Sequence, residues 1–140
     1  MPTLDQTRTI LDATLAKGRE MGLKPLSVVV LDAGGHPLGF LREDGASPGR
    51  FEIARGKAYG TVMLGMAGTA QMARAEAQAY FIAAANGAFD GRLIPVPGGI
   101  LIRDGEGRVI GAVGVTGDTS ENDAEAGLAG IAAAGLSGEA

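Results

Sequence analysis

The chain has 140 residues, enough for one domain with one core, and 46% of them are hydrophobic, which argues against disorder. A net charge of -4, without a lysine or arginine cluster, argues against nucleic acid or an anionic membrane as a partner. The absence of cysteine excludes disulfides, a thiolate nucleophile and cysteine-based metal centres. Because the sequence shows neither a signal-peptide pattern nor an apolar run of about 20 residues, we expect a soluble cytoplasmic protein.

The N-terminal half predicts a helix, a hairpin and a second helix. Thr3 and Gln6 have the spacing of a capping box, and apolar residues then recur at helical spacing. A β-branched run follows, and the turn residues DAGGHP separate it from a second apolar run. The segment GASPG then breaks the chain. The predicted elements are a helix ending at Gly22, strands over 25–32 and 38–44, and a helix over 50–66.

The C-terminal half predicts a third helix, a second hairpin and a last helix. Gly68 and Thr69 precede an alanine-rich segment that ends at Gly87, and the turn Gly105-Glu106-Gly107 separates two apolar runs. The predicted elements are a helix over 70–86, a loop over 89–99, strands over 100–104 and 108–115, a helix over 120–134 and a frayed tail. The complete order is α-β-β-α-α-β-β-α. Because short turns imply antiparallel pairing, we expect an α/β (α+β) fold with a central antiparallel sheet flanked by helices.

Four segments carry a resemblance to a known family. In chain order they are VVVLDAGGHPLGFLREDGA, IARGKAY, PVPGGILIRD and VIGAVGVTGDTSENDAEAGLAGI. Together they resemble the GlcG/HbpS-like family of haem-binding proteins, a domain also found at the C-terminus of PduO-type cobalamin adenosyltransferases. The resemblance implies a profilin-like fold, a single GlcG/HbpS-like domain over 1–140, assembly into a homo-oligomer, and haem or a related tetrapyrrole as ligand.

The segment after the last predicted strand is the first candidate site. Ser120 is expected to cap the last helix with Asp123 at the third helical position, which would satisfy free N–H groups and the helix dipole. Gly117 lets the chain turn, and its neighbours Asp118 and Thr119 add polar groups beside the helix N-terminus. We expect both capping and the lining of a pocket that holds a carboxylate.

Lys57 is the second candidate, because glycine and alanine surround it in GKAYG. We expect its ammonium group to enter a cavity shared with Asp118, Thr119 or Asp123, where Lys57 and Asp123 would have shifted pKa values and act as catalytic groups. The further predicted ligand-binding residues are Arg42, Arg55, Gly98 and Gly99.

No metal site is expected. Asp118, Glu121, Asp123 and Glu125 do not form a calcium-type loop, and the only histidine, His36, falls in a turn where an exposed polar residue needs no functional explanation.

Three functions stay open on the sequence alone. The first is binding of haem or a related tetrapyrrole, which rests on the resemblance. The second is a cofactor-independent lyase or isomerase that uses Lys57 and the acids of 117–123 on a carboxylated substrate. The third is a purely structural or interaction domain.

Overall fold

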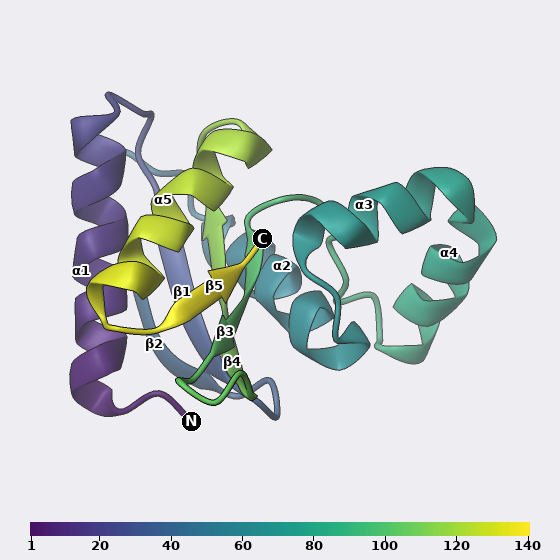
Figure 1. The fold of residues 1–140 in the computed structure, drawn as a ribbon. Coiled ribbons are helices and arrows are strands. Elements are labelled where there is room, and N and C mark those ends of the chain that lie inside the picture. The colour runs from purple at the N-terminus through teal and green to yellow at the C-terminus, as the bar shows by residue number, and fades with distance from the viewer.

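The computed structural model describes all 140 residues and has the predicted order of elements, with one predicted helix divided and one short strand added (Figure 1). The elements are α1 (Leu4–Glu20), β1 (Ser27–Asp32), β2 (Pro37–Arg42), α2 (Arg50–Leu64), α3 (Gly68–Ala77), α4 (Ala79–Ala88), β3 (Gly99–Arg103), β4 (Val109–Thr116), α5 (Ser120–Ala133) and β5 (Ser137–Glu139). The capping box of Thr3 and Gln6 is present at the start of α1. No helix has the length and apolar character needed to cross a bilayer.

The five strands form one antiparallel sheet in the order β2-β1-β4-β3-β5. Helices α1 and α5 cover one face, α2 lies against the other, and α3 and α4 extend away beyond α2 (Figure 1). The sheet is therefore the middle layer of three, and its three inner strands, β1, β4 and β3, are covered on both faces.

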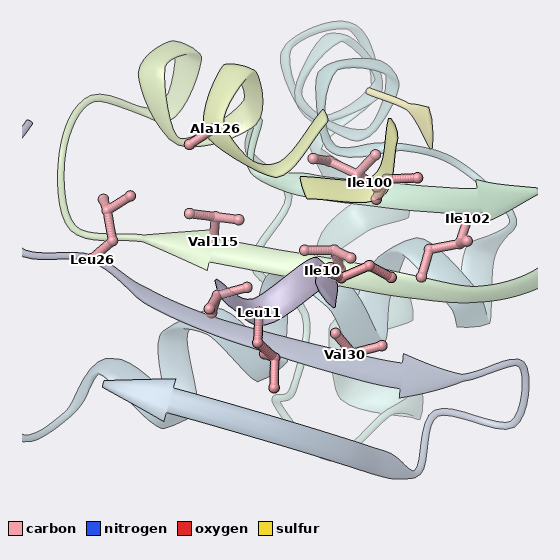
Figure 2. Close-up of a cluster of buried hydrophobic side chains, with 11 residues drawn as sticks. Ile10, Leu11, Leu26, Val30, Ile100, Ile102, Val115 and Ala126 are labelled. Carbon is pink, nitrogen blue, oxygen red and sulfur yellow. The ribbon is translucent and has the colours of Figure 1, made fainter. Parts of the chain in front are cut away.

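Each face of the sheet has its own core, because successive strand residues point to opposite sides. Val28 and Val30 of β1 join the cluster beneath α1 and α5, whereas Val29 and Leu31 face α2. Figure 2 shows the larger cluster, in which side chains of α1, β1, β3, β4 and α5 meet. This two-sided burial explains the continuous apolar run of β1.

Helix α2 approaches the sheet closely at two glycines on neighbouring strands. Gly99 of β3 pairs with Gly114 of β4. A methyl group on Gly114 would collide with the carbonyl oxygen of Ala54, and one on Gly99 would collide with the carbonyl oxygen of Lys57. The missing side chains let the α2 backbone rest on the strands, and this contact fixes the position of Lys57 above the end of the sheet.

The helix predicted over 70–86 is two helices, α3 and α4, separated at Gln78. Gln78 leaves helical geometry, with φ -139° and ψ 64°, although no glycine or proline is present there. The turn lets α4 fold back on α3, so that the guanidinium of Arg74 lies 4.2 Å from the centre of the Phe81 ring and Ile82 is buried. Tertiary packing thus overrides the local helical preference.

The C-terminal tail was expected to fray, but residues Ser137–Glu139 form β5 and pair with β3. Arg103 of β3 forms an ion pair with Glu139, with 3.1 Å between Nη2 and Oε1. The prediction failed because three exposed residues show no strand pattern of their own, and the pairing depends on the free edge of β3.

Candidate functional site

Lys57 and Asp123 form a buried ion pair at the end of β4. Lys57 Nζ lies 3.1 Å from Asp123 Oδ2 and donates a second hydrogen bond, of 2.9 Å, to the carbonyl oxygen of Val115. The side chains of the lysine and the aspartate are 5% and 1% exposed. The predicted proximity of Lys57 to the segment after β4 is therefore observed.

The lysine reaches Asp123 by passing over Gly98. A methyl group on Gly98 would lie 3.0 Å from both Cδ and Nζ of Lys57 and 2.6 Å from the Val115 carbonyl oxygen. The other carboxylate oxygen of Asp123 accepts a hydrogen bond of 2.9 Å from the backbone N–H of Asp118. The pair therefore joins α2 to β4 and α5.

Burial controls the electrostatics of the pair. It lowers the pKa of Lys57 and raises the pKa of Asp123, because both charged forms lose water, and the attraction between the two partners opposes each shift. Neither residue lines any of the three cavities in the structure, so the cavity predicted to surround the ammonium group is absent. The arrangement serves to connect structural elements, and catalysis by these two residues stays a prediction.

The N-terminus of α5 differs by one residue from the prediction. Thr119, rather than Ser120, is the capping residue, and its hydroxyl accepts a hydrogen bond of 3.2 Å from the N–H of Asn122. Ser120 is the first helical residue. Both residue types cap helices well, so the residue types alone do not decide between them. The chain turns just before the cap at Gly117, which has a positive φ of 142°.

Asp118 connects this turn to the segment before β1. Its carboxylate accepts hydrogen bonds from the side chain of Asn122 and from the N–H groups of Lys24 and Thr119, at 2.9, 3.0 and 2.9 Å. These bonds, led by that of Asn122, lower the pKa of Asp118 to about 2. Asp118 is thus a carboxylate at neutral pH that holds two loops together.

A cleft lies at the same end of the sheet, and we call it the strand-end cleft. Its volume is about 230 Å³, and its lining residues are Lys24, Pro25, Gly45, Ala46, Ser47, Arg50 and Gly117. Gly117 is the one predicted ligand-binding residue that lines it. The cleft is bordered by the chain before β1, the segment before α2 and the turn after β4.

Arg50 is the best-positioned cation of the strand-end cleft. Its Nη1 donates a hydrogen bond of 2.7 Å to Thr116 Oγ1, and its Nε donates one of 3.1 Å to Ser47 Oγ. Neither Arg50 nor Lys24 takes part in an ion pair of the chain. A guanidinium has five N–H donors, so Arg50 retains donors for an anion. Sequence reasoning missed both cations, because only the fold brings 24, 50 and 117 together.

The other predicted ligand-binding residues lie elsewhere. Arg42 is exposed at the end of the edge strand β2 and lines no cavity. Arg55 lines a separate cavity on the outer side of α2. Gly98 and Gly99 are buried beneath α2, where their backbone meets Lys57. The structure thus brings Gly117, Asp118 and Thr119 together with Lys57 and Asp123, and leaves the two arginines outside that group.

His36 lies at the opposite end of the sheet from the strand-end cleft. β1 begins at Ser27 opposite Thr116 and ends at Asp32 opposite Gly111, and the turn with His36 follows. The imidazole is 78% exposed, with Nδ1 3.2 Å from Asp32 Oδ1. No group of three or more histidine, cysteine, aspartate or glutamate side chains is arranged to hold a metal ion.

The family model described as "Haem degrading protein HbpS-like" matches residues 3–132. The chain belongs to the HbpS-like family. A comparison with curated proteins found no match for this HbpS-like chain.

Solved structures share the fold of this HbpS-like chain. A heme complex of PduOC is 22% identical, with a TM-score of 0.82 over 94% of this chain and 93% of the other. ORFY of Klebsiella pneumoniae is 25% identical, with a TM-score of 0.82 and coverage of 95% and 90%. HbpS is 24% identical, with a TM-score of 0.78 and coverage of 93% and 87%. These scores place the three-layer fold within the family.

Proposed function

We propose that this chain binds haem or a related tetrapyrrole, and that a carboxylate of the ligand enters the strand-end cleft. The observation that carries the proposal is the match of the HbpS-like haem-degrading family over residues 3–132. A relative with the same fold, PduOC, has been solved as a heme complex. Tetrapyrroles such as haem carry carboxylates on one edge of a flat apolar ring, and this chemistry sets the requirements for the site.

The strand-end cleft suits the carboxylate edge. Arg50 supplies a positive charge that forms no ion pair in the chain, Lys24 adds a second charge beside the Asp118 carboxylate, and Ser47 adds a hydroxyl group. Charge-assisted hydrogen bonds from a guanidinium to a carboxylate are among the strongest polar contacts in proteins. The cleft is too small for a whole macrocycle, so the ring would lie outside it and only the carboxylate edge would enter.

The strand-end cleft does not suit iron. No histidine, methionine or tyrosine lines it, and the chain has no cysteine. His36 is at the other end of the sheet and its ring contacts Asp32. We therefore assign no axial ligand from this cleft, and the proposed recognition rests on carboxylates and charge.

The test is a titration with haem and with iron-free protoporphyrin IX, followed by the Soret band and by tyrosine fluorescence. We expect Arg50→Gln to weaken binding of both ligands by roughly tenfold or more, because it removes a charge-assisted hydrogen bond. Arg8→Gln on the exposed surface of α1 is the matched control and should bind like the wild type. Equal affinity of wild type and Arg50→Gln would contradict the proposed place of the carboxylate. Absence of binding of either ligand to the wild type would contradict the proposed function itself.

The same titration with His36→Ala addresses iron ligation. We expect an unchanged Soret spectrum, since His36 is held at the opposite end of the sheet. A six-coordinate spectrum that appears in the wild type and disappears in His36→Ala would show that the histidine binds the iron.

A further inference from the structure

A second cavity lies on the outer side of α2, away from the strand-end cleft. Its volume is about 220 Å³, and it is bordered by one turn of α2 and by the loop after α4, through Glu52, Ile53, Arg55, Gly56, Gly91, Arg92 and Ile94. We call it the Arg55 pocket. It shares no lining residue with the strand-end cleft.

Arg55 is the unusual residue of this pocket. It takes part in no ion pair, and its Nε atom is buried without a hydrogen-bond partner. A buried N–H donor that has lost water without gaining a partner is costly, and native proteins contain few of them. Because no carboxylate of the chain compensates Arg55, its guanidinium is available to an anionic ligand in the pocket.

Arg92 lines the same pocket, and contacts with Tyr59 and Phe89 fix the position of its side chain. Its guanidinium lies 4.3 Å from the centre of the Tyr59 ring, and its Nε donates a hydrogen bond of 3.1 Å to the carbonyl oxygen of Phe89. The guanidinium of Arg55 lies 5.9 Å from the same ring centre. Two cations thus lie near one aromatic ring. Arg92 is paired with the exposed Asp90, with 3.6 Å between Nη2 and Oδ2, whereas Arg55 has no carboxylate partner, so an anion in the pocket would compensate Arg55 first.

The remaining lining defines the rest of the ligand. Ile53 and Ile94 provide apolar contact, and Gly56 and Gly91 have no side chains to fill the space. Glu52 at the rim is unfavourable for a doubly charged anion such as phosphate. A singly charged group with an apolar body matches these features best.

We propose that the Arg55 pocket is a binding site for a small organic acid, with a carboxylate held between Arg55 and Arg92 and an apolar or aromatic body against Ile53 and Ile94. A carboxylate suits two guanidinium forks because each offers parallel N–H donors. The site goes beyond the proposed tetrapyrrole function and is tested without any tetrapyrrole.

The test is a titration of ¹⁵N-labelled protein with benzoate, followed by NMR. Shift changes should concentrate at 52–56 and 91–94, and the Arg55 Nε–H signal should move with them. Arg55→Gln should weaken benzoate binding by roughly tenfold to a hundredfold, because it removes a charged donor. Glu52→Gln should strengthen binding, because it removes the competing carboxylate at the rim.

Two controls and one substitute variant complete this test. Benzamide has the same ring without the charge and should bind at least tenfold more weakly than benzoate. Arg8→Gln, on α1, should bind benzoate like the wild type. If Arg55→Gln does not fold, Arg55→Lys replaces it, since the ammonium group keeps the charge and loses the fork.

Three results would overturn the proposal. The first is that benzoate changes NMR signals only of residues away from this pocket. The second is that wild type and the Arg55 variants bind benzoate with equal affinity. The third is that inorganic phosphate binds as tightly as benzoate. None of them bears on haem binding, so failure here is distinguishable from failure of the proposed function.

Discussion

Lys57 and Asp123 approach each other from opposite faces of the sheet and meet at the end of β4, with 3.1 Å between Nζ and Oδ2. Lys57 belongs to α2, which covers one face, and Asp123 to α5, which covers the other. The pair is thus a buried polar link between the two outer layers at the end of the central strand. The Lys57 ammonium also donates a hydrogen bond to the carbonyl oxygen of Val115, and the Asp123 carboxylate also accepts one from the N–H of Asp118. These bonds hold both side chains in place.

Replacement of Lys57 by methionine is expected to destabilise the fold. The variant leaves Asp123 buried without its counter-ion. Breaking a buried pair by removing one partner costs about 3–5 kcal/mol. Urea denaturation measures the loss, and the double variant Lys57→Met with Asp123→Leu should recover most of it. A stable single variant would show that the pair adds little.

Gly117→Ala should damage both the fold and the strand-end cleft. Gly117 has a positive φ of 142°, and a methyl group there would collide with the carbonyl oxygen of Pro25, which lines the same cleft. We expect a loss beyond the roughly 1–3 kcal/mol of backbone strain alone. Gly22→Ala is the matched control, since Gly22 also has a positive φ, of 69°, and its new methyl group would meet nothing within 4 Å. Equal melting temperatures of the two variants would contradict the predicted collision.

Stability should decline in acid partly because of Asp118. Its pKa is lowered from 3.8 to about 2, first by Asn122 and then by backbone N–H groups of Lys24 and Thr119. A lowered folded-state pKa stabilises the protein above pH 3.8, and this contribution is lost as the pH falls towards 2. The stability difference between wild type and Asp118→Asn should therefore shrink between pH 5 and pH 2. A difference that stays constant over this range would refute the assignment.

The protein is expected to be a homo-oligomer, and α4 is the surface that we expect to be covered. Its sequence, AYFIAAANGA, has no charged residue, yet Ile82 is its only buried residue, and Tyr80 is 72% exposed. Exposed apolar patches of this kind mark interaction surfaces. Light scattering should show more than one chain per particle, and Ala84→Glu should lower the mass, whereas Ala16→Glu on the exposed side of α1 should not. A monomeric wild type at micromolar concentration would contradict this prediction.

Sequence reasoning succeeded where local signals and burial agree. The cap at Thr3, the β-branched run of β1 and the turn around Gly105 each determine their own element. It failed at Gln78 and at the tail from Ser137, where the conformation depends on contacts with distant residues and the local residues give no sign of it.

The candidate site was only partly accessible from sequence for the same reason. The proximity of Lys57 and Asp123 followed from the fold that the resemblance implied. Arg50 and Lys24 were missed because Lys24 lies in the connection before β1 and Arg50 begins α2, and only the fold brings the two together. The pairing of Arg55 with Arg92 required knowledge of where the loop after α4 returns to α2.

The short strand β5 has a practical consequence for handling the protein. Its three residues cover the edge of β3, a strand that carries Ile100, Leu101 and Ile102, all fully buried. An uncovered apolar edge offers free N–H and C=O groups to a strand from another molecule. A deletion of 137–140 would therefore favour aggregation during expression, because it exposes the edge of β3.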